Sequence, residues 1–165
     1  MKFSTLTAAA SSLLGITMLP GASGTPTAAG LTHLGTANLT IGTTVPIGAG
    51  PRGDRNFYPV VGGSFSGPAI SGTVFPSGGD WGLGDQTAGQ FYVDARFILH
   101  TADGANIYIE ANGPQQPDGT FYTRIKLETG NETYYWLNGV VAVGVTTIDP
   151  SFQFLISEFW RLEVL

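Results

Sequence analysis

The clearest structural signal in the chain is the stretch Gln90–Ala111, QFYVDARFILHTADGANIYIEA, which has the pattern of two strands joined by a tight turn. From Phe91 to Leu99 apolar and aromatic side chains recur at every second position, as expected for a half-buried strand. Asp103-Gly104 then supplies residues that tolerate the positive φ of a hairpin turn. The opposite face carries the polar side chains Tyr92, Asp94, Arg96, His100, Asn106, Tyr108 and Glu110. This polar face is either a wet outer surface or the lining of a barrel interior, and the pattern leaves both open.

The composition predicts an all-β protein with one domain. The chain has 165 residues, of which 24 are Gly and 10 are Pro, and no long helical period follows residue 24. Short alternating segments separated by turn residues predict about seven to nine strands, which form either a sandwich or a barrel. The last segment, Ser151–Leu165, is long and apolar and needs an edge to pair with, so we predict a single small antiparallel β-barrel, calycin- or lipocalin-like in outline.

Charge and cysteine content narrow the classes of partner. The net charge of −5 argues against binding to nucleic acid or to an anionic membrane. The chain has no cysteine, which excludes disulfides, thiol catalysis and cysteine-ligated zinc. Its two histidines, His33 and His100, cannot form a multi-histidine metal site. We therefore predict no metal and no cofactor, and a small molecule as the partner, and the sequence is compatible with a homo-oligomer.

The amino-terminal segment resembles a secretory signal. Lys2 precedes an apolar run, and Ala22-Ser23-Gly24 supplies small residues suited to cleavage. We assign residues 1–24 to a signal peptide, residues 25–37 to a flexible lead-in and residues 38–165 to the barrel domain. Sequons at Asn38 and Asn131 agree with export and are candidate glycosylation sites. The expectation is thus a secreted protein, and the alternative is a cytoplasmic one with an apolar amino terminus.

The carboxyl-terminal third predicts further strands. Residues 120–129 alternate, with Phe121, Thr123, Ile125 and Leu127 on one face. Residues 132–145 also have strand character, with Trp136 on the same face as Tyr134 and Val140. In the last segment Glu158 shares a face with apolar side chains. That carboxylate is either a charge that protects an edge strand from aggregation or a group in the lumen with a raised pKa.

Five short segments, in this order, resemble the uncharacterised-protein family 0311, also called domain of unknown function 3237. They are Val61–Pro68, Gly78–Trp81, Asp94–Phe97, Thr101–Tyr108 and Glu128–Asn138. The resemblance extends over roughly residues 40–165 and implies a small β-barrel, without implying a reaction. Members of the family are mostly cytosolic-looking bacterial and fungal proteins, so the apparent signal segment departs from the family's pattern.

Candidate site residues come from the polar hairpin face, the glycine-rich loop and the last strands. For catalysis we consider His100, Asp80 and Glu158, since imidazole and carboxyl groups can transfer protons. For ligand binding we consider aromatic side chains that can stack and charged or polar groups that can hold an acidic ligand. These candidates are Trp81, Arg96, Asp103, Tyr108, Arg124 and Trp136. Several have structural alternatives: Asp103 as a turn residue, Arg96 in a surface ion pair and Trp136 in the core.

Three classes of function remain open on the sequence. The first is a barrel that binds a small, partly aromatic or acidic molecule. The second is a cofactor-independent isomerase, cyclase or lyase of secondary metabolism, which needs an ionisable group with a shifted pKa inside the barrel. The third is a secreted structural or interaction protein with a filled core. An open lumen favours the first two classes, and a carboxyl or imidazole group inside it favours the second.

Overall fold

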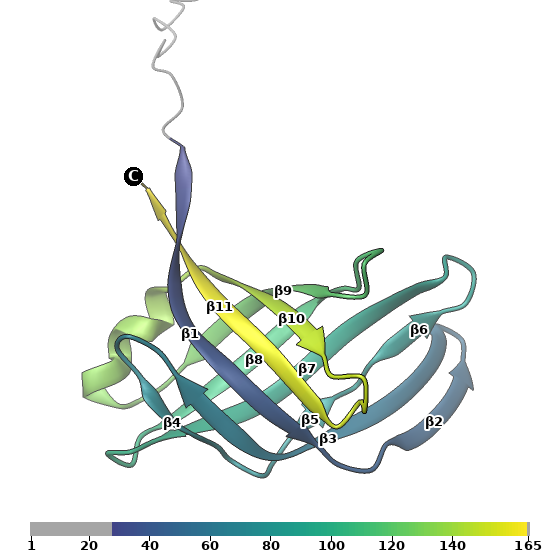
Figure 1. Cartoon of the computed structure of the whole chain (residues 1–165), viewed down its shortest axis with the longest axis horizontal. Helices are drawn as coiled ribbons and strands as arrows, with labels where there is room; N and C mark the ends of the chain where they lie inside the picture. Colours follow the sequence, from purple (N-terminus) through teal and green to yellow (C-terminus); the bar gives the residue numbers. More distant parts are fainter. Residues whose placement is uncertain (1–27, 165) are drawn as a thin grey trace, which may run out of the picture.

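The computed structural model describes residues 28–164, which form a closed antiparallel β-barrel with one short helix (Figure 1). The predicted signal peptide, residues 1–24, lies outside the described residues. The strands are β1 (Ala29–Ile41), β2 (Val45–Gly50), β3 (Gly53–Ser66), β4 (Ser71–Val74), β5 (Gly79–Asp80), β6 (Leu83–Asp85), β7 (Gln90–Thr101), β8 (Asn106–Pro114), β9 (Phe121–Glu128), β10 (Ala142–Ile148) and β11 (Phe154–Val164). The helix, η1 (Glu132–Gly139), is a 3-10 helix.

The barrel closes because β3 pairs on one side with β1 and on the other with the short strands β4, β5 and β6. These three short strands also pair with β7 and together occupy one position in the ring. The ring then runs β7, β8, β9, β10, β11, β1 and β3, which gives eight positions. The predicted class, a small antiparallel barrel of about seven to nine strands, is confirmed.

The hairpin at Gln90–Ala111 forms as predicted, as β7 and β8. Phe97, Leu99, Ile107 and Ile109 are each at most 3% exposed and lie in the core. The polar face of the hairpin is the outer surface of the barrel, since the side chains at 94, 96, 108 and 110 alternate with these buried ones. The two alternatives for this face are thereby resolved in favour of the solvent-facing one.

The lead-in boundary and the helix differ from the sequence-based expectation. β1 begins at Ala29, so most of the predicted flexible lead-in, residues 25–37, is strand as far as it is described. Ala29 pairs with Val164, and this pairing with β11 overrides the weak local β-propensity of the Thr-, Ala- and Gly-rich segment. Residues 132–139, predicted as strand, form η1, and the strand there, β10, begins only at Ala142.

Hydrogen bonds at both ends of η1 explain why a helix replaces the strand. Asn131 is the N-cap, and its side chain accepts a hydrogen bond from Thr133 N at 3.0 Å. Asn138 exchanges two 2.9 Å hydrogen bonds with the backbone of Thr129, one from Thr129 N and one to Thr129 O. Leu137, which is fully buried, anchors the helix in the core. One sequon asparagine, Asn131, thus caps the helix while remaining exposed, and the other, Asn38, is exposed on β1.

The two ends of the barrel differ. Helix η1 and the β7–β8 turn lie at one end, where Leu137 packs into the core (Figure 1). The β6–β7, β8–β9 and β10–β11 turns gather at the other end, which we call the mouth (Figure 1). Beyond the barrel, β1 and β11 continue side by side as a two-stranded extension (Figure 1). Across residues 28–164, we find no helix of the length and apolarity needed to span a membrane.

One glycine of the segment Val61–Pro68 sits where two backbones meet. Gly63 has φ +140°, and a Cβ placed there would lie 2.0 Å from Asn38 O on β1. A side chain at this position would push β3 away from β1. The glycine-rich motif therefore serves the closure of the barrel at this point.

Candidate functional site

A cavity of about 280 Å³ occupies the half of the barrel nearer the mouth. Its wall is made mainly of apolar and aromatic side chains. They are Leu39, Ile41, Val60, Phe91, Val93, Ala95, Phe97, Ala111, Phe121, Ile148, Phe152, Leu155 and Phe159. Polar groups also reach the wall at Thr44, Tyr58, Asp80, Gln115, Thr123, Thr146 and Ser157. An apolar cavity with a few polar groups is the usual form of a small-molecule site.

The register of three strands turns Asp80 toward this cavity. Asp80 on β5 pairs with Tyr58 on β3 and with Ala95 on β7. Residues directly opposite one another in an antiparallel pair point to the same face of the sheet. Tyr58 and Ala95 both line the cavity, so the Asp80 carboxyl group does too. Asp80 is partly buried there and is the only Asp or Glu among the residues of the wall.

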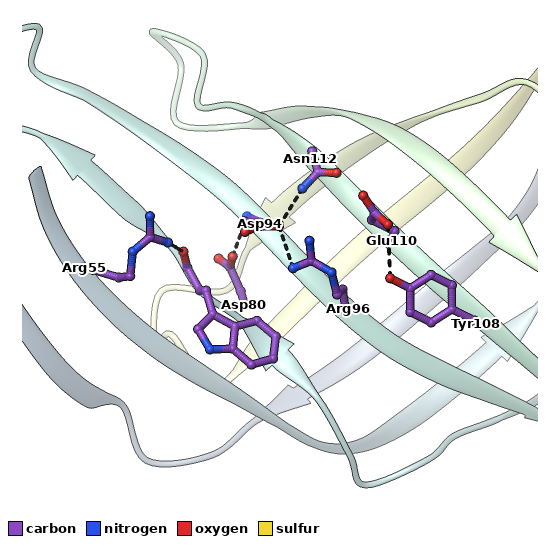
Figure 2. Close-up of polar contacts among 8 residues, drawn as sticks. Arg55, Asp80, Asp94, Arg96, Tyr108, Glu110 and Asn112 are labelled. Carbon is purple, nitrogen blue, oxygen red and sulfur yellow. Dashed lines mark hydrogen bonds and ion pairs between the residues drawn. The ribbon is translucent and has the colours of Figure 1, made fainter. Parts of the chain in front are cut away.

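A local break in the β5–β7 ladder holds the Asp80 side chain. Trp81 N donates to Asp94 O at 3.0 Å, but Trp81 O accepts a hydrogen bond from the guanidinium of Arg55 instead of from Asp94 N. Asp94 N donates to Asp80 Oδ1 at 2.7 Å (Figure 2). Among residues 28–164 this is the only hydrogen bond to the Asp80 carboxyl group, so its second oxygen is available to a ligand.

Burial raises the pKa of Asp80 to about 6, from an ordinary value of 3.8. Desolvation is the largest cause, because the ionised carboxylate is poorly solvated beside the apolar wall. The hydrogen bond from Asp94 N and the charge of Arg55 favour the ionised form and lower the pKa, whereas the charge of Asp94 raises it. Near neutral pH a useful fraction of Asp80 is therefore protonated, as a general acid requires.

The other polar groups of the cavity are neutral. Burial, Asp80 and Asp54 raise the pKa of Tyr58, so its phenol stays protonated. Thr146 Oγ1 and Ser157 Oγ are hydrogen-bonded to each other at 2.7 Å. The Thr123 hydroxyl is buried and has no hydrogen-bond partner among residues 28–164. Phe152, at the mouth, is 72% exposed and has φ +58°, an unusual conformation for an aromatic residue.

Three of the predicted binding residues lie outside the barrel. Arg96 forms an exposed ion pair with Asp94 at 2.8 Å (Figure 2). Tyr108 donates to Glu110 Oε2 at 3.1 Å on the same outer face (Figure 2). Arg124 is exposed on the outer face of β9.

The remaining candidates are also away from the cavity. Trp81 packs on the outside against Phe57, with ring centroids 4.7 Å apart. His100 and Asp103 lie at the η1 end, where His100 Nδ1 meets Asn106 Oδ1 at 2.8 Å and Asp103 accepts from Thr101 and from Tyr134. Trp136 is 41% exposed on η1, and Glu158 is exposed on the outer face of β11. Of the nine candidates, Asp80 alone lines the cavity.

Sequence reasoning did not single out Tyr58, Thr123, Thr146 or Ser157. The alternation in β9 assigned Thr123 to the apolar face, together with Phe121 and Ile125. A hydroxyl group on an apolar face is a signal, readable from sequence, of a polar group inside the barrel. Among residues 28–164, no cluster of three or more His, Cys, Asp or Glu side chains has an arrangement suited to a metal ion.

Solved structures with the same fold include a β-barrel-like protein of Acinetobacter baumannii and an enzyme of Penicillium herquei. The first has a TM-score of 0.77 and 25% identity, and the match covers 84% of this chain and 99% of the other. The second has a TM-score of 0.71 and 30% identity, over 86% of this chain and 99% of the other. Both confirm the barrel.

Similar sequences include one with a named activity. The hydroalkoxylation enzyme phnH of Penicillium herquei is 31% identical over 139 residues, which cover 84% of this chain and 87% of that protein. A UPF0311 protein of Rhodopseudomonas palustris is 29% identical over 126 residues, which cover 66% of this chain and 82% of that protein. The profile of a family described as protein of unknown function, DUF3237, matches residues 29–162. The chain belongs to this DUF3237 family, as its sequence resemblance indicated.

Proposed function

We propose that this protein is a cofactor-independent enzyme that adds a hydroxyl group across a carbon–carbon double bond within one small, largely apolar molecule. The observation that carries the proposal is Asp80, a carboxyl group with a raised pKa of about 6 on the wall of an otherwise apolar cavity. The reaction class follows from the similarity to the hydroalkoxylation enzyme phnH. Asp80 is the general acid.

The cavity suits such a reaction because protonation of an alkene needs an acid that is not surrounded by water. The apolar wall disfavours the ionised carboxylate, so it keeps Asp80 protonated with its O–H available to the ligand. Phe91, Phe121 and Phe159 present aromatic surface to the ligand, which also stabilises a developing positive charge on carbon.

The proposed reaction is an isomerisation in which atoms and charge balance. Asp80 gives its proton to one alkene carbon, the π electrons form the new C–H bond, and the other carbon becomes a carbocation beside the Asp80 carboxylate. The hydroxyl oxygen of the same molecule bonds to that carbon, and its proton returns to the carboxylate through water. No oxidant, reductant or second substrate is consumed.

Turnover of ortho-methallylphenol tests this proposal. This compound carries a phenol and an alkene whose protonation gives a tertiary carbocation, and its product is a dimethyl-dihydrobenzofuran. We expect the wild-type protein to form this product faster than buffer does, with a rate that falls as pH rises through about 6. Asp80→Asn should lower the rate at least about 100-fold, because the carboxamide keeps the shape but cannot donate this proton.

Glu128→Gln is the matched control, since it makes the same chemical change on an exposed carboxylate of the outer face, at the η1 end. It should leave the rate unchanged. Product formation by Asp80→Asn at the wild-type rate would refute the assignment of Asp80. Binding of the phenol in the cavity without any product would reduce the function to the second candidate, a small-molecule binding protein, which the same cavity supports.

A further inference from the structure

Three hydroxyl groups of the cavity form a cluster on neighbouring strands. Thr123 lies on β9, Thr146 on β10 and Ser157 on β11. Thr146 on β10 pairs with Ser157 on β11. Two residues before Thr146, Gly144 on β10 pairs with Thr123 on β9. All three hydroxyl-bearing residues line the cavity. We call Thr123, Thr146 and Ser157 the hydroxyl wall.

Thr123 has an unused hydrogen-bonding group. The residue is 5% exposed, and its Oγ1 has no partner among residues 28–164. A buried hydroxyl without a partner is unfavourable and calls for an explanation in a native structure. A Cβ at Gly144 would lie 2.5 Å from Thr123 Oγ1 and 2.9 Å from the Ile125 side chain, so the glycine adds no side chain of its own beside the hydroxyl. The Thr123 hydroxyl is therefore buried beside Ile125 without a hydrogen-bond partner among residues 28–164.

The other two hydroxyls supply a second free donor. Thr146 and Ser157 share one hydrogen bond of 2.7 Å, which uses one of their two hydroxyl protons. The remaining hydroxyl proton has no acceptor among residues 28–164. Together with Thr123, the wall thus offers two O–H donors to an oxygen atom of a bound molecule.

Ring order puts the hydroxyl wall across the cavity from Asp80. From β5, which carries Asp80, the strands follow as β7, β8, β9, β10, β11, β1 and β3 before the ring returns to β5. In this ring of eight positions, β10 is the fourth strand from β5 in either direction. The hydroxyl wall is centred on β10, so a ligand in the cavity lies between it and the Asp80 carboxyl group.

We propose that the hydroxyl wall is an oxygen-anchoring subsite, which binds a hydroxyl or carbonyl oxygen of the ligand and directs the ligand's apolar part toward Asp80. This inference deepens the proposed function and rests on it for the role of Asp80, but the anchoring itself is a binding property. The ligand class is a compact apolar molecule whose oxygen lies near the double bond that Asp80 protonates and on the face opposite to Asp80. Proton and oxygen then reach the double bond from opposite walls.

Binding of two probes that differ by one hydroxyl tests the subsite. Ortho-methallylphenol carries the oxygen, and methallylbenzene has the same carbon skeleton without it. By isothermal titration calorimetry with Asp80→Asn, in which turnover is slowed, we expect the phenol to bind about tenfold more tightly than the hydrocarbon. In Asp80→Asn/Thr123→Val the affinity for the phenol should fall about tenfold, and the affinity for the hydrocarbon should not change.

Folding and the matched control are checked in the same experiment. Thr123→Val removes an unpaired hydroxyl and keeps the branched shape, so its melting temperature should equal or exceed that of the parent protein. Thr73→Val makes the same change on the exposed outer face of β4 and should leave both affinities unchanged. Equal binding of the two probes, or a phenol preference that survives Thr123→Val, overturns the proposal.

The two proposals fail in different ways. If the phenol preference of Asp80→Asn is lost in Asp80→Asn/Thr123→Val but the wild-type protein makes no product, the hydroxyl wall stands and the enzymatic proposal fails. If Thr123→Val in the wild-type background turns over ortho-methallylphenol with unchanged kcat and KM, the anchoring fails and the assignment of Asp80 stands.

Discussion

At the scale of single residues, Asp80 combines a structural cost with a chemical use. Its carboxyl group accepts a 2.7 Å hydrogen bond from Asp94 N, yet burial raises its pKa to about 6. Groups held in unfavourable environments are concentrated at functional sites, where stability is exchanged for reactivity. The outer residues Arg96 and Tyr108 are different, because their hydrogen bonds and ion pairs are exposed and belong to the surface.

We expect Asp80→Asn to stabilise the protein at alkaline pH. The folded pKa of Asp80 lies above its ordinary value of 3.8, so ionisation opposes folding: the cost is absent below about pH 4, grows between the two pKa values and is complete above about pH 6. A difference of about two pKa units corresponds to about 3 kcal/mol. Urea unfolding of both proteins near pH 8 should show a gain of this order for the variant, and near pH 4 almost none. An equal gain at both pH values would mean that Asp80 is not a buried ionising group.

How much of the site the sequence could predict differs from one residue to the next. Asp80 could be nominated from its place in Gly78–Trp81, but the face it occupies depends on its register with Tyr58 and Ala95, which the two-residue strand β5 does not encode by alternation. The sequence places Arg96 on the polar face of β7. It does not decide whether that face points into the barrel or to solvent, because either face of a hairpin can line a barrel. Alternation assigns Thr123 to the buried face. Its lack of a hydrogen-bond partner depends on which groups of the neighbouring strands surround its hydroxyl, and the sequence of β9 does not show that.

At the scale of elements, strands with strong alternation were predictable and those fixed by long-range pairing were not. β7, β8 and β9 alternate clearly and formed as predicted. The start of β1 at Ala29 depends on pairing with β11, more than 120 residues later in the chain, so local propensity could not locate it. Helix η1 depends on the Asn138–Thr129 hydrogen bonds, and its aromatic residues gave residues 132–139 the composition of a strand.

The β1–β3 junction gives a prediction at this scale. Gly63→Ala should lower the free energy of unfolding by more than about 2 kcal/mol, because the residue has φ +140° and its Cβ would meet Asn38 O. Gly130→Ala is the control, since no atom lies within 4 Å of its Cβ position and its φ is not in the left-handed region. Its effect should stay within about 0.5 kcal/mol. Denaturant unfolding of the two variants compares them directly, and equal stabilities would show that the two backbones are not in close contact.

At the scale of the whole molecule, the barrel has one packed half and one hollow half. Leu137 and the core residues fill the end that η1 covers, whereas the cavity of about 280 Å³ occupies the half nearer the mouth. The class of the fold was predictable because composition, turns and strand length all favour a barrel. The cavity was not predictable from the sequence. Its volume depends on how the side chains of eight strand positions meet, and no single segment carries that information.

The central claim is that the cavity holds a protonatable carboxyl group in contact with the bound ligand, and an NMR titration of the Asp80 side-chain carboxyl carbon tests it most directly. Asp80→Asn identifies the resonance. The account predicts a pKa of about 6 in the free protein and a further rise when ortho-methallylphenol fills the cavity and removes water from the carboxyl group. A pKa near the ordinary 3.8, unchanged by the ligand, would contradict it.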